Sequence, residues 1–365
     1  MRHIPMVNLQ EQYLHIKSEI NRAILDCLDT ANFIRGKEIS AFEKDLALYL
    51  NVSHVIGCGN GTDALQIALM ALDLPKGSKI IVPAFTYIAP VEVIKLLGHE
   101  IVYADVDSAT FNITPETIEQ VYTDDVKAII PVHLFGQCCN MRGIVEFAQK
   151  HTLTIIEDNA QSLGAIKGCT HNGIITASFF PTKNLGAYGD GGALMTNDDT
   201  LAKKIRTIAN HGQTRKYDHE LIGVNSRLDA IQAAILSVKL KYLNEFILRR
   251  QQVAAFYDAH LKHIPQIQIP ARSDFSTHTF HQYTIKTNPA YRDKLQQFLM
   301  QREISSAIYY PMPCYKQKAY LQPNLYFPNA EMLSASVLSL PIYPEISEEQ
   351  LLYICNSIKA FFDTI

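Results

Sequence analysis

The sequence predicts an α/β protein with a mostly parallel central sheet covered by helices, followed by a smaller C-terminal α+β domain. The first observation is that short apolar strand segments alternate with helical segments from about residue 54 to 196. The second is a change of pattern after about residue 265, where another mixture of strands and helices follows one long helix. The third is the length, because 365 residues suit two domains better than one small core.

The first fifty residues are predicted to form a helical arm in front of the first strand. Apolar residues recur at helical spacing over 11–28 and again over 39–50, with a break at 31–36.

The alternating part places polar side chains after its strands. Ligands of parallel sheets collect at the carboxyl ends of strands. Because Asn60, Tyr87, His133, Asp158 and Lys183 each follow a strand closely, we expect them to lie near one another. The predicted strands are 54–58, 79–83, 101–104, 127–132, 152–157, 178–180 and 193–196, and the predicted helices are 63–74, 89–97, 115–122 and 141–151.

A long helix over 228–256 is predicted to bridge to the smaller domain. That domain is expected to contain a strand at 279–287, a helix at 291–301, a strand at 306–309 and a closing helix at 348–362. We therefore divide the chain into a large ligand-binding domain, 1–235, which includes the helical arm, and a part at 236–365 that holds the bridging helix and the small domain.

Composition excludes several classes of protein. The net charge is −3 and the basic residues are spread along the chain, so no nucleic-acid partner is expected. The longest apolar stretches, such as 127–135, are too short to span a membrane, and residues 1–10 lack the apolar core of a signal peptide. The seven cysteines lack Cys-x-x-Cys spacing and favour reduced thiols, so a cytoplasmic protein is expected. Histidine spacing indicates no metal site.

The segment Ser-Phe-Phe-Pro-Thr-Lys, which ends at Lys183, is the most informative in the chain. It follows an acidic strand end and precedes a glycine run at 186–192. Ser178 stands five residues before the lysine and Asp158 stands 25 residues before it. This spacing predicts a Schiff base between Lys183 and an aldehyde cofactor, with the hydroxyl at the cofactor's phosphate and the aspartate at its ring nitrogen. Aromatic and small neighbours favour partial burial, which lowers the pKa of a lysine.

Each of the other motifs has a functional and a structural interpretation. The turn at 58–63 offers backbone N–H groups to a phosphate, or is a tight turn with a helix cap. Asp158 is a helix cap, a metal ligand or the partner of a cationic ring. Tyr87 stacks on a cofactor or fills a core. Arg227 starts a helix without a ligand, or holds a phosphate or carboxylate.

Taken together, these segments resemble the DegT/StrS family of sugar aminotransferases, which depend on pyridoxal 5′-phosphate. The resemblance covers nearly the whole chain, in the right order. It is carried by 60–65 (Asn-Gly-Thr-Asp-Ala-Leu), 83–87, 131–136 (Pro-Val-His-Leu-Phe-Gly), 157–161, 178–183, 189–192 and 310–313 (Tyr-Pro-Met-Pro).

The resemblance implies a fold of the aspartate-aminotransferase type and a homodimer with sites shared at the subunit interface. It implies that Lys183 is the Schiff-base lysine and proton shuttle, and that Asp158 pairs with the pyridine nitrogen. It also places Gln161 near the ring hydroxyl and Tyr87 on the ring. The remaining implied residues are Gly61, Thr62, Asp63 and Ser178 at the phosphate, Asn225 at the phosphate of the partner subunit's cofactor, and Arg227, Tyr309, Tyr310 and Tyr188 at the substrate.

The implied reaction takes an amino group from L-glutamate and passes it to a keto group of a nucleotide-linked sugar. The segments at 211–213 and 223–229 are most similar to the branch that aminates C3 of UDP-2-acetamido-2-deoxy-3-oxo-glucuronate for surface polysaccharides, and Arg227 suits the uronate carboxylate. Tyr309 and Tyr343 depart from that branch, which has histidines there. The alternative acceptor is a dTDP- or UDP-linked 3- or 4-keto-6-deoxy sugar.

Two other classes of protein are open at this point. One is a regulatory protein that binds the cofactor without turnover, and the intact Lys183 and Asp158 oppose it. The other is a nucleotide-binding dehydrogenase, which the missing dinucleotide glycine pattern opposes.

Overall fold

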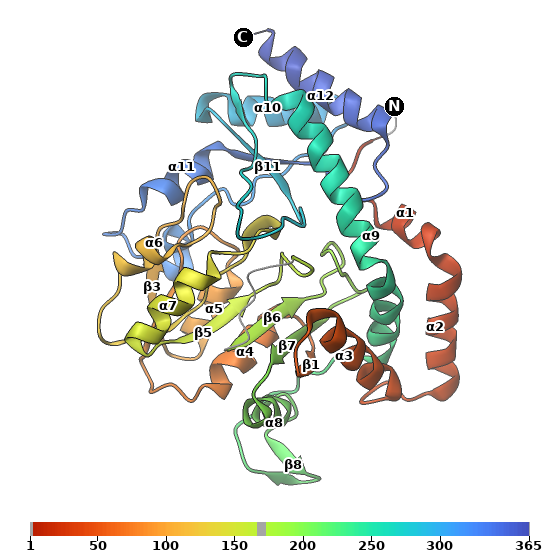
Figure 1. The fold of residues 1–365 in the computed structure, drawn as a ribbon, viewed down its shortest axis with the longest axis vertical. Coiled ribbons are helices and arrows are strands. Elements are labelled where there is room, and N and C mark those ends of the chain that lie inside the picture. The colour runs from red at the N-terminus through yellow and green to blue at the C-terminus, as the bar shows by residue number, and fades with distance from the viewer. Residues whose placement is uncertain (1–2, 166–172, 365) are drawn as a thin grey trace.

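The large domain is built on a seven-stranded sheet (Figure 1). The computed structural model describes residues 3–364 except 166–172. The strand order is β1-β7-β6-β5-β4-β2-β3, and β7 runs antiparallel to both of its neighbours while all other pairs are parallel. The predicted mostly parallel sheet is therefore confirmed. The strands are β1 (His54–Cys58), β2 (Lys79–Pro83), β3 (Glu100–Ala104), β4 (Val126–Ile129), β5 (Thr154–Asp158), β6 (Ile174–Ser178) and β7 (Gly192–Thr196).

Helices pack on both faces of this sheet, as the apolar strands require. Along β7, Leu194 packs in a core with α4, α5 and α8, whereas Ala193 and Met195 pack in another core with α3 and α9. Successive strand side chains point to opposite faces, so a strand between two cores needs apolar residues at every position. The helices are α3 (Lys37–Leu50), α4 (Gly61–Ala71), α5 (Ala89–Leu96), α6 (Pro115–Glu119), α7 (Met141–His151), α8 (Asp199–Ile208) and α9 (Ala230–Leu261), with a 3₁₀ turn η1 (Leu134–Gly136).

The predicted helix at 11–28 is two helices, α1 (Leu9–His15) and α2 (Lys17–Thr30), which meet at Ile16. Ile16 and Ile20 pack on Ile235 and Val238 of α9, so the arm lies along the long helix (Figure 1). The chain before α1 belongs elsewhere, because Ile4 pairs with Ile304 and packs in the core of the small domain.

The small domain holds a three-stranded antiparallel sheet in the order β10-β11-β12. Helix α9 joins the two domains, since Leu243 and Ile247 pack in a core of the large domain and Val253 and Tyr257 pack in the core of the small one. The elements are β10 (Ile267–Gln268), β11 (Tyr283–Thr287), β12 (Val337–Leu340), α10 (Pro289–Gln301), α11 (Pro328–Ser336) and α12 (Glu348–Phe362), with 3₁₀ turns η2 (Cys314–Lys316) and η3 (Lys318–Tyr320).

Two predicted strands are wrong. The strand predicted at 178–180 ends at Ser178, because the chain then turns through Pro181, which has no N–H group for a ladder. The strand predicted at 306–309 is reduced to an isolated bridge between Ala307 and Ser339.

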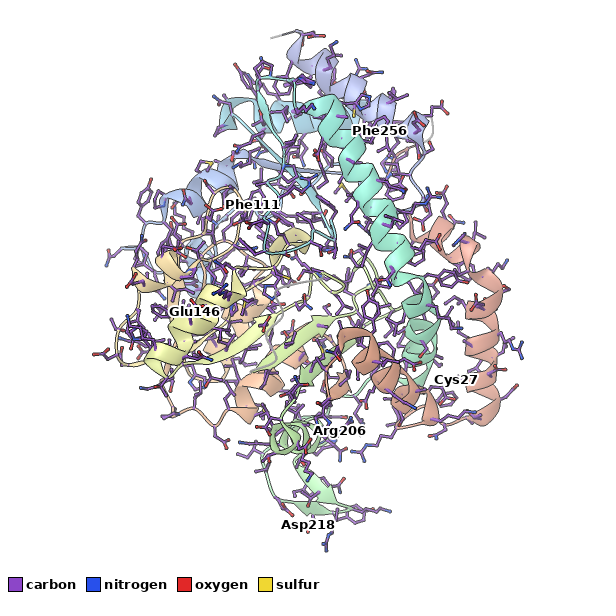
Figure 2. The ribbon with its side chains drawn as sticks, viewed as in Figure 1. Cys27, Phe111, Glu146, Arg206, Asp218 and Phe256 are labelled. Carbon is purple, nitrogen blue, oxygen red and sulfur yellow. The ribbon has the colours of Figure 1, made fainter. Side chains whose placement is uncertain are left out.

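Sequence patterns also missed α8 and the hairpin of β8 (Gln213–Arg215) and β9 (Asp218–His219). The hairpin projects from the large domain, with Asp218 at its far end beyond Arg206 of α8 (Figure 2). Throughout the described ranges, every helix is too short or too polar to cross a bilayer.

Candidate active site

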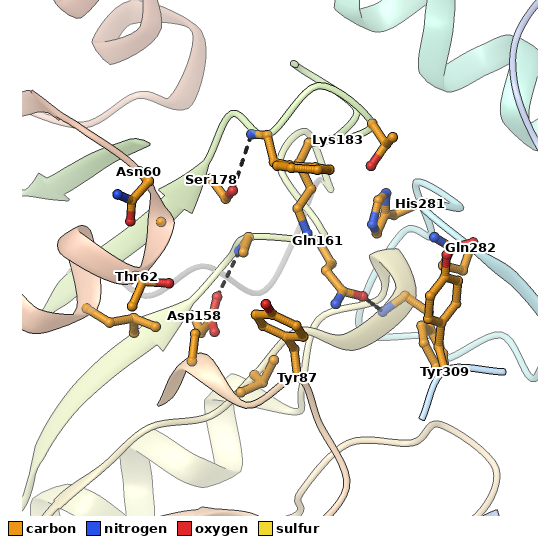
Figure 3. A pocket seen from close by; sticks show the side chains of 18 of the residues that line it. Asn60, Thr62, Tyr87, Asp158, Gln161, Ser178, Lys183, His281, Gln282 and Tyr309 are labelled. Atoms are coloured by element: carbon orange, nitrogen blue, oxygen red, sulfur yellow. Dashed lines mark hydrogen bonds between the residues drawn. The ribbon is translucent and has the colours of Figure 1, made fainter. Parts of the chain in front are cut away.

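A cavity of about 490 Å³ lies where the parallel strands end (Figure 3). Segments that follow β1, β2, β4, β5 and β6 line one side of it, and residues 281–282 and 309–310 of the small domain line the other. A cavity of this size accommodates a ligand of several rings, and its position is the usual ligand site of parallel sheets.

Four of the five residues expected to converge line this cavity, namely Asn60, Tyr87, Asp158 and Lys183. His133 lies behind it, fully buried, with Nε2 3.0 Å from the Glu157 carboxylate. Its Nδ1 accepts the backbone N–H of Cys139 at 3.2 Å, which fixes the ring proton on Nε2.

Lys183 stands on a tight turn after β6, where its backbone N–H donates to the carbonyl of Phe180 at 2.8 Å. Burial lowers the pKa of its amine to about 8, and the neighbouring Asp158 carboxylate opposes this by favouring the charged form. A neutral amine is the nucleophilic form of lysine. The fold therefore supplies the condition that Schiff-base chemistry needs near neutral pH.

Asp158 ends β5 inside the same cavity, and its side chain accepts the N–H of Ala160 at 3.0 Å (Figure 3). Burial raises the pKa of its carboxyl, while the Ala160 N–H and Lys183 act in the opposite direction. A cationic group placed against this carboxyl would hold it ionised, as a protonated ring nitrogen does.

The start of α4 forms one end of the cavity. Asn60 caps the helix by accepting the N–H of Asp63 at 2.8 Å, and the first helical turn directs its remaining N–H groups outward. A Cβ on Gly61 would lie 2.6 Å from Cβ of Ser178, and a Cβ on Gly192 would lie 2.3 Å from the carbonyl oxygen of Asn60. Only glycine permits these approaches, which bring the helix start against the strand end beside Ser178.

Thr62 belongs to this helix start, and Ser178 faces it from the end of β6 (Figure 3). Hydroxyl groups together with helical N–H groups make an anion site. Asp63 is turned away from it, because its carboxylate accepts the hydroxyl of Ser226 at 2.6 Å.

The middle of the cavity is aromatic. Tyr87 is 55% exposed, which is incompatible with a core aromatic and leaves its ring available to a ligand. Gln161 accepts the N–H of Phe135 at 2.8 Å and donates to the hydroxyl of Tyr310 at 3.1 Å. Tyr309 lines the same wall as Tyr310.

Three further predicted residues lie outside this cavity. Tyr188 packs edge-on against Tyr13 with ring centroids 6.2 Å apart, and the Lys239 ammonium lies 5.1 Å from its ring centre. Asn225 pairs with Asn210 through a backbone bridge. Arg227 lines a separate cavity of about 240 Å³.

Sequence reasoning missed His281 and Gln282, which line the cavity from the small domain. Both were assigned to the interior of a strand at 279–287, but β11 begins only at Tyr283. No local pattern marks them, because they reach the cavity through contacts with distant parts of the chain. Phe180, Thr182 and Asp190 also line it.

A nucleophilic lysine, a buried carboxylate and an anion-binding helix start in one cavity define an enzyme that works through a phosphorylated aldehyde cofactor. Residues 14–359 match the DegT/DnrJ/EryC1/StrS aminotransferase family, and the chain belongs to it. The protein is accordingly a sugar aminotransferase that depends on pyridoxal 5′-phosphate.

Similar proteins are matched over nearly their whole length. A "pleiotropic regulatory protein" of Geobacillus stearothermophilus is 42% identical, covering 98% of each chain. The UDP-2-acetamido-2-deoxy-3-oxo-D-glucuronate aminotransferase of Pseudomonas aeruginosa is 41% identical, covering 97% of this chain and 99% of that protein. The crystal structure of DesV from S. venezuelae superposes with a TM-score of 0.97 at 34% identity, covering 100% of both chains.

Proposed function

We propose that the enzyme transfers the amino group of L-glutamate to C3 of a UDP-linked 2-acetamido-3-keto-hexuronate, a precursor of surface polysaccharide, in the cytoplasm. The observation that carries the transfer chemistry is the Lys183–Asp158 pair beside the start of α4 in one cavity. The choice of sugar is supported by the 41% identity to the P. aeruginosa enzyme.

Each part of the cofactor would have a partner among the residues that line the cavity. Backbone N–H groups of Gly61 and Thr62, with the hydroxyls of Thr62 and Ser178, would hold the phosphate. Tyr87 would lie on the ring, Gln161 near its hydroxyl, and Asp158 at its nitrogen. The close approach that glycine permits at positions 61 and 192 is the structural feature that such an anion site needs.

The bound cofactor supplies an aldehyde that condenses with amines and a ring that accepts electrons. Lys183 supplies the base, because its amine accepts a proton at Nζ near neutral pH and returns it to the neighbouring carbon. Asp158 would keep a positive ring nitrogen protonated when the cofactor is bound. Tyr309 and Tyr310 form an aromatic wall of the same cavity.

The active form is proposed to be a homodimer with shared sites. Asn225 and Arg227 lie outside the cavity of their own chain, so they would serve the site of the partner subunit, at the cofactor phosphate and the uronate carboxylate. Exposed apolar side chains on and beside the projecting hairpin support a contact surface there, since Ile222 is 89% exposed and Tyr217 is 81% exposed.

The test is incubation of the purified enzyme with L-glutamate and a panel of keto nucleotide sugars, with products read by mass. The panel contains the UDP-3-keto-hexuronate and dTDP- and UDP-linked 3- and 4-keto-6-deoxy sugars. Amination of only the deoxy sugars would overturn the proposed acceptor. A protein that shows the cofactor band without bleaching by glutamate would be a binding protein without turnover.

The same preparation tests the assigned lysine. Lys183→Ala is expected to lose the absorbance band of the lysine–cofactor Schiff base, and a band retained in this variant would move the attachment to another lysine.

A further inference from the structure

The segment that carries His281 and Gln282 is fixed from two sides. On the large-domain side, the N–H of Thr279 donates to the carbonyl of Gly136 at 2.8 Å, and the N–H of Gln282 donates to the carbonyl of Phe135 at 3.2 Å. Gly136 permits this contact, because a Cβ there would lie 2.8 Å from the backbone nitrogen of His281. The segment is thus joined to the loop that follows β4.

Helix α9 holds the same segment from the other side. The buried guanidinium of Arg250 donates to the carbonyls of Phe280 at 3.1 Å, His281 at 3.5 Å and Ile342 at 2.9 Å. Gln251 donates to the carbonyl of His278 at 3.1 Å. These contacts fix the backbone on both sides of His281, so its imidazole is held in place at the seam between the domains.

The imidazole of His281 faces Lys183 from the side opposite Asn60 and Thr62 (Figure 3). It is 5% exposed, and within the described part of the chain its buried Nδ1 has no hydrogen-bond partner. Burial first, and then Lys183 and Arg250, lower the pKa of His281 well below its usual range. The ring is therefore neutral, and it has an unused hydrogen-bonding position.

The cavity offers few charges to an anionic substrate. Of the described residues that line it, Lys183 is the single cationic side chain, and arginine is absent from that lining. The phosphate end lies at Asn60 and Thr62, so a substrate that reacts beside Lys183 would extend toward His281, Gln282 and Tyr309. These three side chains all carry neutral hydrogen-bond donors.

We infer that His281, with Gln282 beside it, binds the α-carboxylate of the amino donor through neutral hydrogen bonds, with the buried Arg250 supplying a favourable field from behind. This inference rests on the proposed transfer from L-glutamate. Arg250 is a positioning residue, because its donors are directed to backbone carbonyls instead of the cavity.

A neutral donor at this position suits an enzyme with two unlike substrates. The amino acid brings a carboxylate next to the reacting carbon, whereas the sugar brings an uncharged ring carbon and its substituent to the same place. An arginine at the position of His281, unlike the Arg227 proposed at the uronate carboxylate, would be left without its partner whenever the sugar is bound, and a buried unpaired charge costs more than an imidazole that can donate to either group.

The test measures binding of glutarate, which has both carboxylates of glutamate but cannot react, to the cofactor-loaded enzyme by calorimetry. His281→Ala is expected to raise the Kd about tenfold or more, because a hydrogen bond to a carboxylate is lost. His281→Asn keeps an N–H donor and is expected to stay much closer to the wild type. His278→Asn is the matched control, since His278 is on the same segment but outside the cavity lining.

Glutarate binding that is absent in the wild type, or equal in the wild type and His281→Ala, would overturn the inference. Bleaching of the cofactor band by L-glutamate separates this from the proposed function. If the wild-type enzyme binds glutarate but L-glutamate does not bleach its cofactor band, the proposed amine transfer is refuted while the carboxylate site at His281 stands. If L-glutamate bleaches the cofactor band of His281→Ala at the same concentrations as in the wild type, the proposed transfer stands and the carboxylate site at His281 is refuted.

Discussion

The lowered pKa of Lys183 predicts how fast its amine reacts as the pH rises. Burial moves this pKa from 10.5 to about 8, a difference of about 2.5 units. At pH 7, roughly a tenth of such an amine is neutral, against about 0.03% for a lysine with an ordinary pKa, which is an enrichment of about 300-fold. The neutral amine is the reactive form, so Lys183 should react far faster than an ordinary lysine near neutral pH.

The assay is competitive acetylation of the cofactor-free protein by acetic anhydride between about pH 6 and pH 10. Acetylation of Lys183 is quantified by mass, and the reference in the same tube is the amino acid lysine with its α-amino group blocked. Labelling of Lys183 should level off above about pH 8, whereas the reference should continue to rise toward pH 10.5. Asp158→Asn removes the carboxylate that raises the pKa of Lys183, so the midpoint should move to lower pH.

Asp190→Asn is the matched control for this shift, because Asp190 also lines the cavity but does not contribute to the pKa of Lys183. A midpoint near 10.5 in the wild type would show that burial of Lys183 does not govern its protonation. An upward shift in Asp158→Asn would show that the Asp158 carboxylate does not raise the pKa of Lys183.

Three other substitutions test the site and its support. Asp158→Ala should fold normally by circular dichroism but lose amine transfer, and retained turnover would refute its assigned role at the ring nitrogen. Gly61→Ala places a Cβ 2.6 Å from Cβ of Ser178, so cofactor affinity should fall at least about tenfold in a fluorescence titration, and unchanged affinity would remove the helix start from the phosphate site. Arg250→Met leaves three carbonyls without their donor and should lower the free energy of unfolding by about 2–4 kcal/mol in urea, while exposed Arg249→Met on the same helix should change it little.

Much of the large domain follows from the sequence, because its signals are local. The ranges predicted for β1, β2 and α7 agree with the structure at both ends, since apolar runs and helical spacing in these segments match what the sheet and its faces require. The convergence of Asp158 and Lys183 also follows, because both come after parallel strands whose carboxyl ends share one edge.

The sequence does not predict which side chains of a motif face the cavity, because that depends on the direction each side chain takes after folding. Asp63 and Thr62 are neighbours in one motif, yet only Thr62 faces the cavity, because α4 rotates successive side chains by about 100° and Ser226 binds the Asp63 carboxylate. Tyr188 follows the catalytic turn closely but packs on Tyr13 of the helical arm. These directions depend on which partner each side chain meets after folding.

The sequence by itself determined the mostly parallel character of the sheet and the convergence of the lysine–aspartate pair, because hydrophobic periodicity and strand ends are properties of short segments. Only the tertiary structure decided the wall opposite the phosphate end. His281 reaches Lys183 because Arg250 and Gly136, both remote from it in the chain, hold its backbone from two domains. Contacts between residues so far apart in the chain leave no periodic pattern in the sequence. They form only once both cores have formed.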